Sequence, residues 1–330
     1  MALRARIQQL SARLRLGTRG RAVRGGERRA PGAAAPGTRL HPGGGIVTVT
    51  VAARPRPRRR ALGWIAEHAI LVAIGVLFIA PVAFVFLTSL MSDKQALTAS
   101  LIPTTWHWEN YLRVFQTVPL LQWFGNSALY AVLATAFMLL SSVPAAYALA
   151  RIRFRGSGAL FLCIIVAMLL PPQVTAIPIY VMWSQLHLTG TLWPLILPNL
   201  LGDAFSIFLL RQFFLTIPKE YADAARIDGC SEWAVLLRVI VPMARPGIAA
   251  AGLFMFFNSW NDYYGPLLYT SENSAAWPVA YGLASFRSVH GTDWSITMTM
   301  TILVMVPVVI IFFFAQKIFV EGITLTGVKG

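Results

Sequence analysis

The chain has 330 residues, of which 56% are hydrophobic and 12% are charged. Soluble domains carry about 25% charged residues, so this composition excludes an ordinary soluble globular fold and indicates a protein with several membrane-spanning segments. The net charge of +15 is concentrated at one end, since residues 1–60 hold fifteen arginines and one acid, whereas the remaining 270 residues hold thirteen basic and twelve acidic residues.

Residues 1–60 are expected to form a basic, disordered tail. The segment is rich in Gly, Ala and Pro and lacks aromatic residues, so it cannot bury enough apolar surface to fold. Its arginines favour an orientation signal, with the rest of the tail as an extension. Nucleic-acid binding is the less favoured alternative. Another hypothesis places the translation start downstream, near residues 47–51, which intact mass of the expressed protein would decide.

Six apolar runs are each long enough to cross a bilayer, which takes about 20 residues per helix. The predicted spans are about 64–91, 124–150, 159–186, 192–214, 246–269 and 294–320, and the third is predicted to be interrupted at Pro171-Pro172 and at Pro178. Lipid offers no partners to open backbone groups, so the predicted fold class is all-α integral membrane, with residues 61–330 as one transmembrane domain. The first run is too long for a signal peptide and contains Pro81, so we expect it to remain as an anchor.

The loops between these runs differ in basic residues. One side holds Arg151, Arg153, Arg155, Arg211, Lys219, Arg226, Arg238, Arg245, Lys317 and Lys329. The other side holds only Lys94, Arg113 and Arg287. Because the side richer in Lys and Arg faces the cytosol, both termini and the loop between the fourth and fifth spans are predicted to be cytosolic.

That loop, residues 218–242, is a polar segment between two apolar runs. Thr216 is expected to cap a first helix that has Glu220 in its first turn, where an acid complements the helix dipole. Gly229 is suited to the left-handed position that ends a helix.

A second helix is expected to begin at the capping residue Ser231 and to end at Pro242. Helical spacing predicts that its apolar residues share one face: Trp233, Leu236, Leu237 and Ile240. The segment is therefore predicted to be a helix–turn–helix. Packing on the protein's own membrane domain and docking of a soluble partner are the two alternatives.

The spacing of this loop resembles the EAA loop of ABC-importer permeases, Glu-Ala-Ala, three residues, Gly, nine residues, Ile, one residue, Leu, Pro. The matching positions are Asp223, Ala224, Ala225, Gly229, Val239, Val241 and Pro242. The chain departs from the pattern at Asp223, Val239 and Val241, and each departure keeps the charge or the branched apolar character. Four further segments resemble the carbohydrate, MalG-like branch of that family: 208–220, 170–178, 258–267 and 319–330. The resemblance covers about residues 64–330 and leaves the tail outside.

In that family the EAA loop forms a coupling helix in a groove of a cytosolic ATPase subunit. The residues to which the resemblance assigns this role are Glu220, Asp223, Ala224, Ala225, Asp228, Gly229 and Pro242. The resemblance implies a permease subunit of an ABC importer in the bacterial plasma membrane, surrounded by lipid, that translocates a sugar or related polyol. The implied partners are a second homologous permease, two copies of the ATPase and an external solute-binding protein.

Several catalytic motifs are absent from the sequence. No Gly-Lys dipeptide occurs, so the chain has no P-loop of the GxxxxGK[ST] form, and HExxH, CxxC and GxSxG are also missing. Cys163 and Cys230 have neither disulfide nor metal-ligand spacing. We therefore expect no enzyme activity, no metal and no cofactor bound by this chain, with ATP used by partner subunits.

Two acids, Asp203 and Asp262, fall within predicted spans, where acids are costly and are candidates for function. The second belongs to the run Asn258, Ser259, Trp260, Asn261 and Asp262. Amides beside an aromatic ring are typical of polyol binding, so Asp203, Asn258, Trp260, Asn261 and Asp262 are the candidates for the translocation pathway. Hydrogen bonding between membrane helices is the structural alternative.

Three other functions compete with a sugar permease. A close alternative is an ABC permease for glycerol phosphate or another small solute. An ion-coupled secondary transporter is remote, because such proteins need charged relays within the membrane and only two acids are available here. A membrane-anchored nucleic-acid-binding protein would depend on the basic tail alone.

Overall fold

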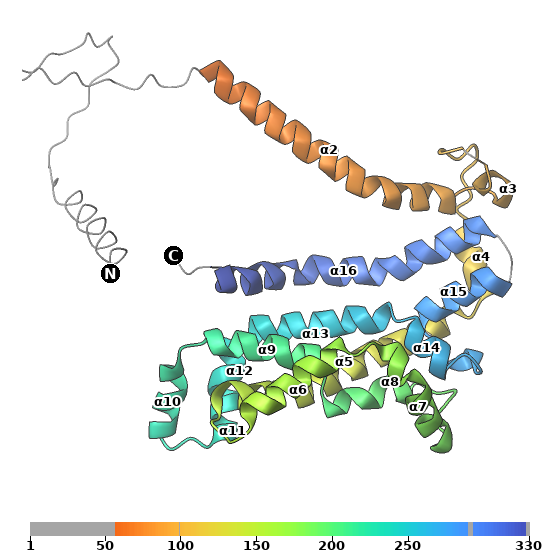
Figure 1. Ribbon diagram of the computed structural model, residues 1–330. Helices are drawn as coiled ribbons and strands as arrows, with labels where there is room; N and C mark the ends of the chain where they lie inside the picture. The colour runs from red at the N-terminus through yellow and green to blue at the C-terminus, as the bar shows by residue number, and fades with distance from the viewer. Residues whose placement is uncertain (1–56, 99, 290–292, 328–330) are drawn as a thin grey trace, which may run out of the picture. The chain divides into compact units, whose positions relative to one another are not determined.

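The computed structural model describes residues 57–98, 100–289 and 293–327, and every regular element in these ranges is a helix (Figure 1). The chain divides into two units, 1–65 and 66–330. Of the first unit the structure describes only the beginning of α2 (Pro57–Ser89), so the expected tail lies outside the described residues up to position 56. The helices treated below belong to the second unit.

Four helical segments are long and apolar enough to cross a membrane. They are Glu67–Ser89 within α2, all of α5 (Leu120–Arg151), Trp193–Thr216, and Trp294–Gln316 within α16 (Trp294–Gly327). The third of these is built from α8 (Trp193–Ile196), the 3-10 turn η1 (Leu197–Leu201) and α9 (Ala204–Thr216). These segments correspond to the first, second, fourth and sixth predicted runs.

The third predicted run is not one straight helix. It consists of α6 (Ser157–Leu169) and α7 (Pro172–Gln185), which meet at an angle of 94°. A residue that precedes proline is pushed out of the helical region, and Leu170, before Pro171, has φ −75° and ψ 120°. The bend therefore follows from the Pro-Pro pair, whereas Pro178 lies within α7.

The fifth predicted run, 246–269, extends beyond the end of the helix that the structure shows. The helix α13 (Arg245–Trp260) stops at Trp260, and a turn separates it from the short helix α14 (Tyr264–Tyr269). At its start, α13 makes an angle of 82° with the preceding segment Glu232–Met243. If each bent pair counts as one span, the described residues hold up to six candidate spans.

The connecting stretches hold four short helices. They are α3 (Asp93–Ala96), α4 (Asn110–Thr117), η3 (Ser274–Ala276) and α15 (Val279–Val289). All four fall in the stretches 92–123 and 270–293, which hold Lys94, Arg113 and Arg287 and so belong to the side predicted to be poor in basic residues.

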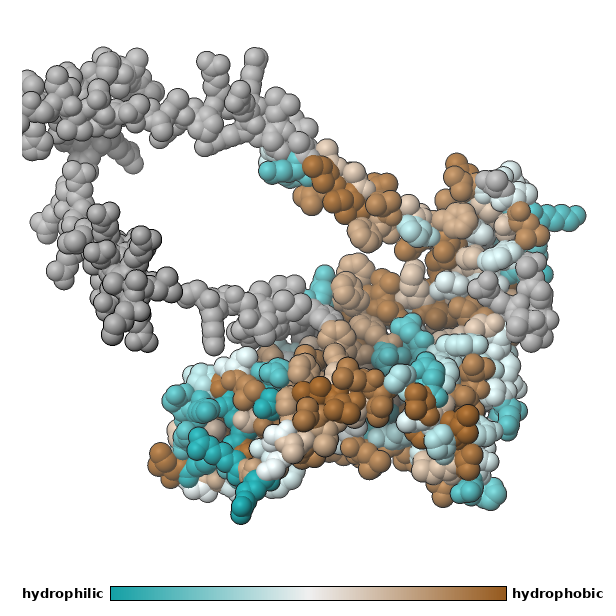
Figure 2. All heavy atoms as spheres, viewed as in Figure 1, coloured by the Kyte–Doolittle hydropathy of each residue, from teal (hydrophilic) through white to brown (hydrophobic). Residues whose placement is uncertain are grey.

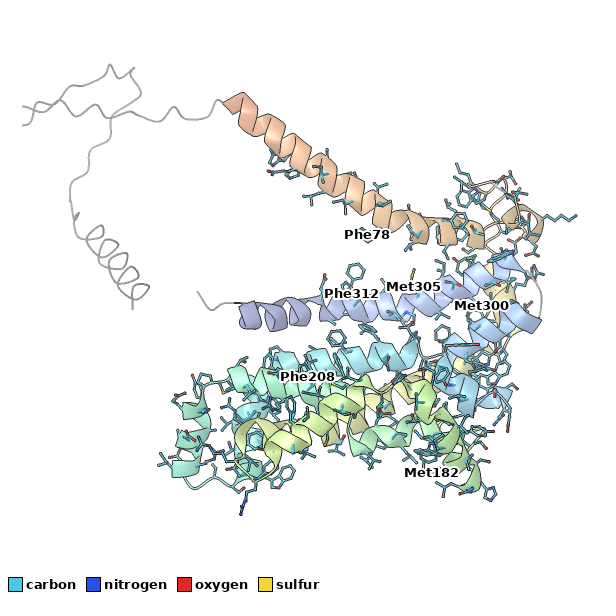
Figure 3. All side chains as sticks on the ribbon, viewed as in Figure 1. Phe78, Met182, Phe208, Met300, Met305 and Phe312 are labelled. Atoms are coloured by element: carbon cyan, nitrogen blue, oxygen red, sulfur yellow. The ribbon has the colours of Figure 1, made fainter. Side chains whose placement is uncertain are left out.

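The helix α5 is the centre of the packing, because it lies against both α9 and α13, while α13 also packs against α16. One buried cluster gathers around Leu210 and Phe214 of α9. A second includes Trp260 and Met300, which is fully buried on α16 (Figure 3). Figure 2 shows hydrophobic residues over much of the visible surface of the helices and hydrophilic residues gathered over α10 and α11. This distribution fits helices that satisfy their own backbone groups and expose apolar side chains to lipid.

Candidate functional site

The polar loop folds as the predicted helix–turn–helix, here called the hairpin, residues 219–243 (Figure 1). Its first helix is α10 (Lys219–Ile227), and its second begins with α11 (Glu232–Val235). Gly229 has φ +82°, which confirms the left-handed turn, and a Cβ there would meet nothing within 4 Å. The Ser231 side chain accepts a hydrogen bond from the Ala234 N–H at 3.3 Å, as a helix cap should.

The predicted cap of the first helix was wrong. The N-cap of α10 is Pro218, which makes no side-chain cap. The Thr216 hydroxyl instead donates to the Phe213 carbonyl at 2.7 Å. Near the end of α9 that carbonyl is within local reach of the hydroxyl, and such a bond competes with capping of the next helix.

The second helix does not end at Pro242 as predicted. It continues through the π-helical turn η2 (Leu236–Ile240) into α12 (Val241–Met243). Proline lacks an N–H and its ring would clash with the carbonyl four residues earlier, so a helix must adjust before it. The adjustment here is a five-residue spacing, in which the Val241 N–H donates to the Leu236 carbonyl.

The apolar residues of the second helix do not share one face, contrary to the prediction. Leu236 and Ile240 are buried, whereas Trp233 and Leu237 are 64% and 60% exposed. The buried pair packs with Val235 against the cluster on α5 and α9. One face of the hairpin therefore packs on the protein's own helices, which was one of the two predicted alternatives for this loop.

Six other residues of the hairpin are exposed, and together we call them the exposed hairpin face. It consists of Tyr221, Asp223, Ala224, Ile227, Trp233 and Leu237. Ile227 is 86% exposed at the end of α10. Among the other residues assigned by resemblance, Glu220, Asp228, Gly229 and Pro242 are exposed and Ala225 is half-buried. Exposed apolar side chains beside small and acidic residues are typical of a surface that docks a partner.

Arg226 joins the two helices of the hairpin. Its guanidinium donates to Asp223 at 2.7 Å within α10 and to both carboxylate oxygens of Glu232 at 2.7 and 3.2 Å. The hydrogen bonds to Glu232 raise the pKa of the Arg226 guanidinium above its usual range. Glu232 also accepts a hydrogen bond from the Tyr147 hydroxyl at 2.6 Å, so the network reaches α5. Arg226, Glu232 and Tyr147 were not predicted as site residues, although opposite charges flanking a glycine turn were a visible signal.

Two further arginines hold the ends of α5 and α9 together. Arg151, at the end of α5, donates to the backbone carbonyls of Phe214 and Ile217. Arg211, on α9, donates to the Leu149 carbonyl at 3.1 Å, and its guanidinium lies 3.9 Å from the centre of the Phe161 ring. The hairpin is therefore attached to helix ends that are themselves fixed.

The two acids that were predicted within spans have separate partners, and Asp262 lies in the turn after α13. Asp203 caps α9 by accepting a hydrogen bond from the Ser206 N–H at 2.7 Å. Asp262 accepts hydrogen bonds from the Tyr130 hydroxyl at 2.9 Å and from the Gly265 N–H at 3.1 Å. The Asp203 N–H donates to the hydroxyl of Ser142 on α5. Ser142 comes twelve residues after Tyr130 on this helix, so the two partners are about 18 Å apart at 1.5 Å per residue. The structure does not bring the two carboxylates together.

The remaining pathway candidates lie in different surroundings. Trp260 is 4% exposed, stacks on Phe256 and donates to the Val304 carbonyl at 3.3 Å. Asn258 and Asn261 are exposed, and the Asn261 amide donates to the Phe257 carbonyl at 2.8 Å. The two amides are thus accessible, whereas the ring expected to stack on a solute lies in the core. A role of these residues in translocation stays a prediction.

The sequence pattern of the family described as "Binding-protein-dependent transport system inner membrane component" matches residues 141–325, a segment that includes the whole hairpin. The chain belongs to this family. It is accordingly a multi-pass permease of the bacterial inner membrane, in agreement with its apolar helices.

Several curated relatives of this permease have names that refer to carbohydrates. The chain is 32% identical over 270 residues to the arabinooligosaccharides transport system permease protein AraQ of Halalkalibacterium halodurans, covering 79% of this chain and 96% of that protein. It is 33% identical over 257 residues to the sulfoquinovosyl glycerol transport system permease protein SmoH of Agrobacterium fabrum, covering 76% and 88%. It is 29% identical to the diacetylchitobiose uptake system permease protein DasC of Streptomyces coelicolor, covering 81% and 97%.

Solved structures show the same fold. A chain of a bacterial ABC transporter involved in the import of the acidic polysaccharide alginate superimposes with a TM-score of 0.68 at 22% identity, covering 81% of this permease and 99% of that chain. A second chain comes from a bacterial alginate ABC transporter in complex with an alginate pentasaccharide-bound periplasmic protein, and it gives 0.58 at 14% identity. At these identities the likeness establishes the fold of an ABC permease.

Proposed function

We propose that this chain is the translocation subunit of an ATP-driven importer for a sugar or oligosaccharide, with six spans and with both termini and the hairpin in the cytosol. The observation that carries the proposal is the hairpin. One of its faces is built into α5 and α9, and the other presents small, acidic and apolar residues outward. The absence of a P-loop supports a separate ATPase as the source of energy. The carbohydrate names of the relatives support the substrate class and do not favour glycerol phosphate.

The exposed hairpin face is the proposed docking surface for that ATPase. Asp223, Ala224 and Ala225 leave room for close approach, and Gly229 sets the angle between the two helices. Glu220 and Asp228 flank this surface, and Pro242 shapes the π turn that leads into α13. Movement of the ATPase would pass through Arg226 and Glu232 to Tyr147 on α5, and so bias a two-state packing of the spans.

The other proposed partners complete the importer. A second homologous permease would supply the facing half of the pathway, a second ATPase copy would serve that subunit, and an external solute-binding protein would deliver the sugar. The family description and the alginate transporter bound to a periplasmic protein support this assembly. The accessible amides of Asn258 and Asn261 are the residues of this chain that we assign to the pathway first.

The test is recovery of the assembly with a tagged full-length chain from membranes of its own host. Wild type is expected to bring down an ATPase, and Asp223→Lys is expected to lose it because the charge reverses at the centre of the exposed hairpin face. Glu109→Lys, the same reversal at an exposed residue away from the hairpin, is the matched control and should retain the ATPase. Normal recovery of ATPase and normal sugar uptake with Asp223→Lys would contradict the proposal.

A further inference from the structure

A cavity of about 260 Å³ lies between the end of α5 and the first turns of α10. Its lining residues are Ala150, Arg151, Ile152, Arg153, Lys219, Ala222, Asp223 and Arg226. Four of these are basic and one is acidic. The cavity is therefore electropositive, and its single carboxylate, that of Asp223, is already bound by Arg226 at 2.7 Å.

The donors in this cavity are only partly used. The Nε atom of Arg151 is buried and has no hydrogen-bond partner within the described part of the chain, although the same guanidinium donates to two carbonyls. Arg153 and Lys219 are exposed and pair with no carboxylate among the described residues. The lining residues of α10 lie along one face of that helix, from Lys219 to Arg226. Free cations gathered in one cavity favour an anion with several oxygens, such as a phosphate.

The surroundings of the cavity indicate where such a phosphate would come from. Arg151 is the last residue of the candidate spanning helix α5, so the cavity lies at the end of a span. The segment that follows exposes Phe154 by 40%, and α6 exposes Leu160 and Leu162 by 50% and 60%. The basic cavity is thus next in sequence to an apolar surface suited to acyl chains. Anionic lipids of the cytosolic leaflet attract basic residues at the ends of spans.

We propose that this cavity binds the phosphate headgroup of an anionic phospholipid of the cytosolic leaflet. The headgroup would bridge Arg153, which follows α5, and Lys219, which begins α10. Occupancy would therefore hold the hairpin against the end of α5, and lipid composition would regulate the surface assigned to the ATPase. The inference rests on the cytosolic location of the hairpin in the proposed function.

The experiment adds phosphatidylglycerol to the purified full-length chain in detergent micelles and counts bound lipid by native mass spectrometry, with phosphatidylcholine for comparison. The double variant Arg153→Gln with Lys219→Gln removes two cations from the cavity. The matched control, Arg155→Gln with Arg238→Gln, removes two exposed cations that do not line it. The cavity variant should weaken phosphatidylglycerol binding by roughly tenfold or more, since one charged hydrogen bond is worth about tenfold in affinity.

Equal losses in the two double variants would overturn the proposal, because they would show diffuse attraction by net charge. Equal binding of phosphatidylcholine would overturn it as well. Displacement of the lipid by inorganic phosphate would assign the cavity to a soluble phosphate and reject the lipid. Arg153→Lys with Lys219→Arg keeps both charges and should retain the lipid, which separates loss of the site from loss of folding. The ATPase recovered with the wild-type chain reports on the proposed function independently of the lipid count.

Discussion

The turn at Gly229 gives the sharpest test of the hairpin. Its φ of +82° is a conformation that costs an L-residue roughly 1–2 kcal/mol, which corresponds to a five- to thirtyfold smaller population of the native turn. A Cβ at this position meets nothing within 4 Å, so Gly229→Ala would act through backbone strain alone. Asparagine tolerates the left-handed region, and Gly229→Asn should therefore cost less than Gly229→Ala.

The assay measures the ATPase recovered with the tagged full-length chain and the rate of sugar uptake in cells. Gly229→Ala is expected to lower both by up to the factor derived above, and Gly229→Asn is expected to lie between the alanine variant and wild type. Gly156 provides the matched control, because it has φ +88° and open space for a Cβ but lies at the start of α6. Its alanine variant carries the same strain away from the hairpin and should retain the ATPase.

Two results would refute this reasoning. If Gly156→Ala lost as much ATPase as Gly229→Ala, strain anywhere in the domain would explain the loss. If alanine and asparagine at position 229 both behaved like wild type, the angle of the hairpin would not matter for docking.

Three other predictions concern the hairpin, the pathway and the packing of the helices. Arg226→Gln should destabilise the hairpin by about 1–2 kcal/mol, since it removes a bidentate but partly exposed ion pair with Glu232. Limited proteolysis should therefore cut the hairpin faster in this variant. Arg238 has no such pair among the described residues, so Arg238→Gln should not change the cleavage rate. Asn261→Ala should lower sugar uptake at normal expression if its exposed amide contacts the solute, and unchanged uptake would remove it from the pathway. Gly247→Ala places a Cβ 2.6 Å from a ring carbon of Phe213 on α9 and should lower the free energy of unfolding of the purified chain by about 1–3 kcal/mol. Gly158 is in open space, so Gly158→Ala should not lower it, and thermal unfolding of the two variants measures the difference.

The four long apolar helices were predictable, because apolar length is a property of a single segment. The bends were only partly predictable. The Pro171–Pro172 pair marked the break in the third run, but nothing local gives an angle of 94°. The end of α13 at Trp260 was missed although Asn261, Asp262 and the Gly265-Pro266 pair follow it, and the turn also depends on a contact of Asp262 with a distant tyrosine.

The hairpin, too, was predictable from the sequence only in part. Gly229 and Ser231 were predicted correctly because each satisfies a local backbone requirement. The burial of the second helix was not, since helical spacing places its four apolar residues within one broad arc and packing on α5 and α9 buries only the edge that holds Leu236 and Ile240. The exposed Trp233 and Leu237 supply part of the surface that we assign to the ATPase.

The two candidate sites are connected through α5. Near one end of this helix, Tyr147 bonds to Glu232 of the hairpin, and seventeen residues earlier Tyr130 bonds to Asp262 in the turn that follows α13. At 1.5 Å per residue the two hydroxyl-bearing residues are about 25 Å apart along one helix. Both tyrosines belong to the one helix α5, which has Pro144 between them, and in the proposed importer a pull on the hairpin would pass along this helix towards the accessible amides beside Asp262. In the proposed importer, Tyr130→Phe should therefore reduce sugar uptake while the ATPase still binds, whereas Tyr147→Phe should weaken the link between ATP hydrolysis and uptake. Loss of ATPase binding with Tyr130→Phe would contradict this separation of roles.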